Sequence, residues 1–273
     1  MIDPRVLEEM LPYMKDIFGN ASSTEHEYGW ESNDAVNVSR ERISNLINCS
    51  PNEVIFTGGA TEANNIAILG SMEIQEYNCH VLTPRTEHKS VLDIAKHIGK
   101  KGAKVKYLDV MKDGLIDIQE FSDSIEDDTK LVSVMMANNE IGVIQPIEKI
   151  GAVCRDKGIV FHVDAAQAFG KIDIDVNRLN VDLLSVSGHK VYGPKGVGAL
   201  YINSQTMKQK ISATHFGGGH ERGLRPGTLA THSIVGLGKS AEIAKIEKDN
   251  DAKLINGMRE TLIGKIKNGF DAI

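Results

Sequence analysis

The chain has 273 residues, and its composition of 41% hydrophobic and 25% charged residues is ordinary for a folded globular domain. The formal net charge of −6 argues against a general nucleic-acid role, and no apolar run approaches the roughly 18 residues of a membrane span. Cys49, Cys79 and Cys154 form neither a CxxC pair nor a disulfide framework. Together with an N-terminus unlike a signal peptide, they favour a reducing, cytoplasmic setting in which they are buried small hydrophobes.

From the N-terminus, short apolar runs alternate with stretches of helical periodicity. The expected elements are a helix over 4–18, a helix over 30–48, a strand over 54–57, a helix through 69, a strand over 80–83, a helix through 97, a strand over 104–108, a helix over 117–126, a strand over 131–136, a helix over 147–157, strands over 159–163 and 183–186, an apolar run over 197–202 and a helix over 231–267. The unalternated apolar runs predict an α/β fold, a mostly parallel sheet with helices on both faces. The carboxyl ends of parallel strands meet at one edge, where such sheets bind ligands.

The first of these strand ends leads into small residues, Gly58-Gly59-Ala60-Thr61, and then into a helix. Free N–H groups and about half a positive charge converge at a helix N-terminus, so a phosphate is the expected guest. A plain strand-to-helix turn is the alternative, because the sequence matches neither GxGxxG nor a P-loop.

Polar side chains also follow the next strands. His88 comes after the strand over 80–83, where it is either a catalytic residue or the first residue of a helix. Asn139 follows the strand over 131–136, with an Asx turn as the alternative. Asp164 directly follows the strand over 159–163 and lies three residues before Gln167. Its carboxylate needs a partner, because an unpaired buried charge is costly.

The strand over 183–186 delivers Ser187-Gly188-His189-Lys190, which we take as the centre of the site. Burial at a strand end lowers the pKa of a lysine and makes its amine nucleophilic, as a Schiff-base lysine requires. A surface lysine in a hairpin is the alternative. Downstream, the long glycine-rich loop over 215–228 carries two arginines and Thr228, which marks it as functional or disordered.

These residues together meet the requirements of a pyridoxal 5'-phosphate (PLP) pocket. Lys190 would bond to the cofactor aldehyde, Asp164 would pair with the pyridinium nitrogen, and His88 would stack on the ring and move protons. Gln167 and Asn139 would contact the ring hydroxyl region. The phosphate would be held by Ala60, Thr61, Ser187 and His189. No metal site is expected.

The chain resembles the cysteine desulfurases of the class V aminotransferase group, of the kind that serves iron–sulfur cluster assembly. The resemblance covers residues 4–245 and rests on the following motifs: Thr57-Gly58-Gly59-Ala60-Thr61-Glu62, Thr86-Glu87-His88-Lys89, Asn138-Asn139-Glu140-Ile141-Gly142, His162-Val163-Asp164-Ala165-Ala166-Gln167, Ser187-Gly188-His189-Lys190 through Gly196, and Gly217 through Thr228. It implies the PLP-dependent transferase fold type I and conversion of L-cysteine to L-alanine, with the sulfur kept as a persulfide. Lys190 and His88 would be the acid–base groups.

The resemblance also implies partners. The family forms homodimers, and the threonine that matches Thr228 reaches the cofactor phosphate of the partner subunit. An iron–sulfur scaffold protein is the expected sulfur acceptor.

The chain departs from the family at its catalytic cysteine, because none of its three cysteines matches that position. In the family this cysteine lies further towards the C-terminus, and the family also has an opening strand before the helix with which this chain begins. The resemblance therefore implies a chain that is truncated at both ends. Residues 1–245 would form the PLP-binding large domain, and residues 246–273 a long helix and the start of an incomplete small domain. The alternatives are a selenocysteine lyase, another class V PLP enzyme, or an inactive PLP-domain fragment that works beside a partner chain.

Overall fold

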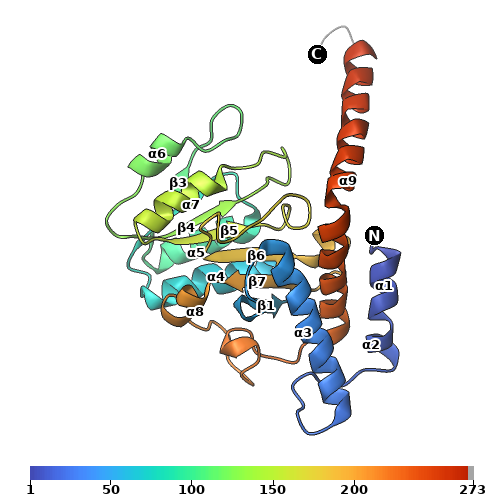
Figure 1. Ribbon diagram of the computed structural model, residues 1–273. Helices are drawn as coiled ribbons and strands as arrows, with labels where there is room; N and C mark the ends of the chain where they lie inside the picture. The colour runs from blue at the N-terminus through green and yellow to red at the C-terminus, as the bar shows by residue number, and fades with distance from the viewer. Residues whose placement is uncertain (270–273) are drawn as a thin grey trace.

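A computed structural model describes residues 1–269 of the chain. Seven strands form one sheet in the order β1-β7-β6-β5-β4-β2-β3 (Figure 1). The strands are β1 (Val54–Thr57), β2 (His80–Pro84), β3 (Lys104–Leu108), β4 (Thr129–Met135), β5 (Val160–Asp164), β6 (Leu183–Ser187) and β7 (Gly198–Ile202). All pairs are parallel except those of β7, which runs antiparallel to both β1 and β6. The predicted α/β architecture with a mostly parallel sheet is therefore confirmed.

Helices cover both faces of this sheet, also as predicted. They are α1 (Pro4–Met10), α2 (Pro12–Lys15), α3 (Glu27–Ile47), α4 (Ala60–Ile74), α5 (Lys89–Lys101), α6 (Ile118–Asp123), α7 (Ile147–Asp156), α8 (Ser204–Gln209) and α9 (Thr231–Gly269), with short 3₁₀ turns at Pro51–Glu53, Gly188–Lys190 and Glu221–Gly223. No helix in the described part of the chain is long and apolar enough to cross a bilayer.

Two apolar cores hold the layers together, one on each face of the sheet. Helices α3, α7 and α9 pack on one face, and α4 and α5 pack on the other. Neighbouring strand residues point to opposite faces, so Phe56 enters the first core and Ile55 the second. Because both faces are covered, the central strands β5 and β6 are buried on both sides, and they appear in the sequence as short, mostly apolar runs.

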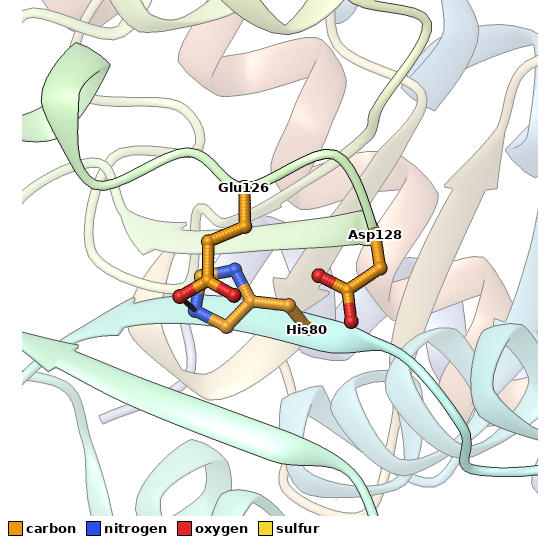
Figure 2. Close-up of side chains that lie close together, drawn as sticks. All are labelled: His80, Glu126 and Asp128. Carbon is orange, nitrogen blue, oxygen red and sulfur yellow. Dashed lines mark ion pairs between the residues drawn. The ribbon is translucent and has the colours of Figure 1, made fainter.

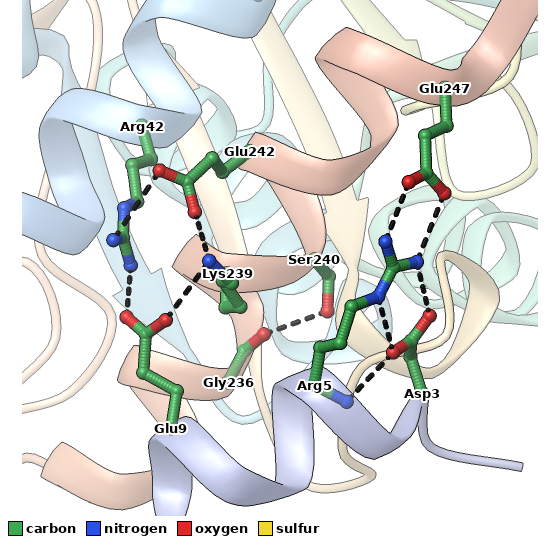
Figure 3. Close-up of polar contacts among 9 residues, drawn as sticks. All are labelled: Asp3, Arg5, Glu9, Arg42, Gly236, Lys239, Ser240, Glu242 and Glu247. Carbon is green, nitrogen blue, oxygen red and sulfur yellow. Dashed lines mark hydrogen bonds and ion pairs between the residues drawn. The ribbon is translucent and has the colours of Figure 1, made fainter.

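The N-terminal helix α1 is fastened to α9 by charged side chains (Figure 3). Arg5 bridges Asp3, at 2.8 Å, and Glu247, at 2.6 Å. Lys239 on α9 contacts Glu9 of α1 at 3.3 Å. The side chains of these pairs keep 20–48% of their surface exposed, so water screens them and we expect them to align the helices more than to stabilise them.

The ends of several helices differ from the prediction. The single helix expected over 4–18 is two short helices, because Pro12 has no N–H to continue the first one. Helix α3 begins earlier than residue 30, since the ring nitrogen Nδ1 of His26 caps it by accepting from the N–H of Gly29 at 3.2 Å. Helix α8 was not predicted. The proposed domain boundary at residue 245 falls inside α9, which continues without a break to Gly269.

Candidate active site

A cavity of about 670 Å³ opens at the carboxyl edge of the parallel strands. Nine of the ten side chains predicted from the sequence line it, which are Ala60, Thr61, His88, Asn139, Asp164, Gln167, Ser187, His189 and Lys190. They come from five strand ends and the loops after them, so the sheet topology has brought together residues up to 130 positions apart (Ala60 to Lys190).

The turn after β1 has the geometry of an anion cradle. Gly59 adopts a φ of +146°, which favours glycine, and no side chain caps α4. The first-turn N–H groups of Ala60 and Thr61 have no intrahelical acceptor, by the geometry of any helix start. Glu62 on the same turn accepts from the N–H of Gly58 and pairs with Arg225 at 3.1 Å, so its charge is partly neutralised beside the cradle.

Asp164 is the buried carboxylate of the site, with 2% of its surface exposed. Its Oδ1 accepts from the N–H of Ala166 and its Oδ2 from the amide of Asn64, both at 2.9 Å. Burial raises the pKa of Asp164, and these two hydrogen bonds act in the opposite direction. The partner that the sequence argument required is therefore an amide from α4, which leaves the negative charge without a cationic partner among the described residues.

His88 is both the start of a helix and a lining residue of the cavity. It is the N-cap of α5, where its Nδ1 accepts from the N–H of Ser90 at 3.1 Å. The hydroxyl of Ser90 lies 2.8 Å from the same nitrogen and accepts from Asn64 at 2.9 Å. Since Nδ1 is occupied, Nε2 is the ring atom that remains to exchange a proton with a bound molecule.

Lys190 lies in the 3₁₀ turn Gly188–Lys190 that follows β6. The expectation that this lysine is buried is wrong, because β6 ends at Ser187 and the turn lifts the side chain into the open cavity, where it is exposed. The hydroxyl of Ser187 lies 3.1 Å from Nδ1 of His189. Burial and the charge of Lys190 both lower the pKa of the neighbouring Lys171.

The two amide side chains differ in what holds them. The Asx turn expected as the alternative at Asn139 is made by Asn138, whose Oδ1 accepts from the N–H of Glu140 at 2.8 Å. Asn139 is exposed and lines the cavity. Gln167 also lines it, and its Oε1 accepts from Lys171 at 3.1 Å.

Thr228, the tenth predicted residue, does not line the cavity and is exposed on the loop over 215–228. This loop is anchored by Glu221, which is buried against Arg40 at 2.8 Å and accepts from the N–H of Phe56 at 2.7 Å. Glu221 thus caps the open edge of β1, and it holds the chain that leads to Thr228.

The cysteines lie outside the cavity. Cys154 belongs to one apolar core and Cys79 to the other, and Cys49 is half-buried. Burial raises the pKa of all three thiols, so each is held as the neutral thiol expected of a small hydrophobic residue.

At the opposite edge of the sheet, where the parallel strands begin, His80, Glu126 and Asp128 come close together (Figure 2). Nδ1 of His80 lies 2.8 Å from the hydroxyl of Thr129, and Asp128 pairs with Lys104 at 2.9 Å. Each of these two groups is thus engaged within the chain, and we assign the cluster no ligand.

The sequence profile of the family described as "Aminotransferase class-V" matches residues 1–271. A protein of Trachipleistophora hominis named "Cysteine desulfurase, mitosomal" is 50% identical over 98% of this chain and 63% of its own length. A protein of Dechloromonas aromatica named "Cysteine desulfurase IscS" is 48% identical over 96% of this chain and 65% of its own length. The chain therefore spans about 63–65% of the length of these curated relatives.

Solved structures agree with this fold. One described as "NIFS-LIKE PROTEIN" aligns with a TM-score of 0.93 and 38% identity over 98% of this chain and 73% of its own. Another, described as "SspA in complex with cysteine", aligns with a TM-score of 0.85 and 41% identity over 94% and 75%.

Proposed function

The chain belongs to the aminotransferase class-V family, and from this premise we propose that it is the PLP-binding part of a cysteine desulfurase. The reaction would convert L-cysteine and an acceptor thiol into L-alanine and a persulfide, breaking one carbon–sulfur bond and forming one sulfur–sulfur bond. The observation that carries the proposal is the cavity itself, in which an exposed lysine, a buried carboxylate and a helix N-terminus face the same space.

The residues of the cavity fit PLP in three respects. The α4 turn offers first-turn N–H groups and a glycine with positive φ to a phosphate. Asp164 carries a carboxylate that is fixed by two donors and has no cationic partner among the described residues, which suits a protonated ring nitrogen. Lys190 is the amine exposed in the same cavity after β6. When bound, PLP supplies an electron sink beside the amino group of the substrate.

The residues of the chain then have separate tasks. Lys190 would hold the cofactor covalently and would accept or return a proton at the substrate. His88 keeps Nδ1 occupied by the N–H of Ser90, so that its Nε2 serves proton transfer. Asp164 orients the ring and stabilises its positive charge, and Asn64 holds this carboxylate in place.

We also propose the partners and setting that the resemblance implies. Thr228 is exposed and lies outside the cavity of its own chain, which is consistent with a homodimer in which it serves the partner's phosphate. The sulfur acceptor would be an iron–sulfur scaffold protein, and the setting would be cytoplasmic. Since none of Cys49, Cys79 and Cys154 lines the cavity, the thiol that takes the sulfur must come from elsewhere.

Borohydride trapping tests the cofactor assignment. The purified chain is incubated with PLP, its visible absorbance is recorded, and the reduced adduct is mapped by peptide mass spectrometry. Label on Lys190 is the expected result. Label on another lysine, or none, would overturn the assignment.

A second assay tests the reaction. The PLP-loaded chain is given L-cysteine with dithiothreitol as the thiol, and the alanine and sulfide released are both measured. A cysteine desulfurase should release the two products in equal amounts. L-Selenocysteine in the same assay distinguishes a selenocysteine lyase, for which the selenium compound alone would yield alanine. Cofactor labelling without alanine from either substrate would favour an inactive PLP-domain fragment.

A further inference from the structure

A second buried carboxyl group lies behind the cavity and has no role in the proposed function so far. Glu87 follows β2, directly before His88, and 6% of its surface is exposed. Its Oε1 accepts from the N–H of Met135, the last residue of β4, at 2.5 Å. Its Oε2 is buried and has no hydrogen-bond partner among the described residues.

The charges around Glu87 make it different from Asp164. Asp164 receives two hydrogen bonds, from Ala166 and Asn64, whereas Glu87 receives one. Burial raises the pKa of Glu87 well above its ordinary value, and the nearby carboxylate of Asp164 raises it further against the opposing hydrogen bond from Met135. Asp164 therefore has more donors for a negative charge than Glu87, and burial favours the neutral form of the group with fewer donors, so the charge resides on Asp164.

Glu87 also fixes the segment that carries His88. The carbonyl of Thr86 accepts from the amide of Asn138 at 3.0 Å, and the carboxyl of Glu87 accepts from Met135. The segment before His88 is therefore tied at two successive residues to the end of β4 and the loop after it. Loss of the Glu87 contact would leave a buried N–H unpaired and one of these two ties broken.

We propose that Glu87 is a positioning residue, held as the neutral acid, which ties the His88 segment to β4 and leaves the single negative charge of the buried pair on Asp164. This inference rests on the proposed function, because Asp164 and His88 are its cofactor-binding and proton-transfer groups. Glu87 itself does not line the cavity.

The variants Glu87→Gln and Glu87→Ala separate the two parts of the proposal. A glutamine has the same shape, is neutral at every pH and can still accept from the N–H of Met135. An alanine removes both the carboxyl group and the tie. If Glu87 acts as a neutral group that accepts from the N–H of Met135, glutamine should keep its function and alanine should lose it.

The first measurement is unfolding by urea without cofactor, at pH 5 and pH 8. A carboxyl group whose pKa is raised by folding makes the folded state less stable as pH rises above the ordinary carboxyl range. The urea midpoint of the unchanged chain should therefore fall relative to that of Glu87→Gln between the two pH values. The charged and titratable groups around Glu87 are Asp164, at the end of β5, and Arg85 and His88, which lie on the same loop as Glu87. Arg85 is paired with Asp109.

A Glu87 that is ionised in the folded state, with a pKa in the ordinary carboxyl range or below it, would titrate outside the range from pH 5 to pH 8. An equal midpoint difference at both pH values would therefore overturn the proposal. The matched control is Asp164→Asn, which removes the neighbouring charge and should shrink the pH-dependent difference at Glu87.

The second measurement is the dissociation constant of PLP, followed by absorbance, together with the pH at which the bound cofactor changes colour. Glu87→Gln should bind within about threefold of the unchanged chain, with the same colour transition, and Glu87→Ala should bind about tenfold more weakly. Equal binding by the alanine variant, or equal losses in both variants, would overturn the positioning role. If the unchanged chain takes up no PLP, the proposed function fails, and the urea measurement still decides whether Glu87 is neutral.

Discussion

Acidic side chains have different partners at the two edges of the sheet, where the parallel strands begin and where they end. At the edge where the parallel strands begin, Asp128 pairs with the ammonium group of Lys104 at 2.9 Å, and both side chains are open to water. At the carboxyl edge, Asp164 has neutral donors alone, and Glu87 has one oxygen without a partner among the described residues.

This difference indicates that a ligand binds at the carboxyl edge of the sheet. A charged group that is satisfied inside the protein contributes to the fold and has little left to offer. A buried charge held by neutral donors is costly, and it is maintained where a bound molecule supplies the missing partner. Substitutions at the carboxyl edge should therefore affect cofactor binding, and those at the other edge should not.

The largest effect is expected at Lys190. Lys190→Ala should abolish the borohydride-trapped PLP adduct, because the exposed amine after β6 is lost. Peptide mass spectrometry after reduction measures this directly. Lys195, another lysine of the cavity, provides the matched control, because the Lys195→Ala variant should still be labelled by PLP at Lys190. A label that survives in Lys190→Ala would remove Lys190 from the centre of the site.

Asp164→Asn should come next. The side chain keeps its shape but loses the charge that faces the ring nitrogen, and a hydrogen bond to a charged group contributes about 1.5–3 kcal/mol. We therefore expect PLP to bind about 10- to 100-fold more weakly, measured by absorbance titration. Unchanged affinity would mean that the buried carboxylate is a structural group, like Asp182 at the other edge, which accepts from the N–H of Phe161 and the hydroxyl of Thr206.

The third prediction concerns His162, which lies in the middle of β5 between the two edges. It is fully buried, its two ring nitrogens lie 2.8 Å and 3.0 Å from the hydroxyls of Ser133 and Ser185, and burial lowers its pKa to about 3. An unfolded histidine titrates at about 6.5, so below that pH the unfolded state takes up a proton that the folded state refuses.

This histidine should therefore destabilise the fold as pH falls from about 6.5 towards 3, by up to about 1.4 kcal/mol per pH unit. Urea unfolding between pH 7.5 and 4.5 should show a shallower loss of stability in His162→Gln than in the unchanged chain. His97→Gln, at an exposed position on α5, is the control and should keep the original slope. Parallel slopes in all three proteins would contradict a neutral buried His162.

The smallest effect is expected at the other edge. Asp128→Asn removes the partner of Lys104, but the pair is exposed, and exposed pairs contribute little. PLP affinity should match that of the unchanged chain, and the urea midpoint should move little. A loss of affinity as large as that of Asp164→Asn would end the distinction between the two edges.

Several features of this fold could be predicted from local sequence. The six predicted strands lie within about two residues of those observed. Five of them are short, mostly apolar and buried runs, whereas β3 at the edge of the sheet alternates between more and less exposed residues. Ala60, His88, Asn139 and Asp164 were recognised because polar or small residues directly after such runs lie at the ligand-binding edge. Helix ends were less predictable, since single residues such as Pro12 and His26 determined them.

By itself, the sequence determined the α/β class, the positions of the strand ends and nine of the residues that line the cavity. The tertiary structure decided the rest: that Asn64 holds Asp164, that Glu87 reaches β4, and that Lys190 is exposed. The physical reason is distance along the chain. Periodicity and turn residues report on neighbours within a few positions, whereas the partner and burial of a polar group depend on segments that meet after folding, such as Asn64 and Asp164, 100 residues apart.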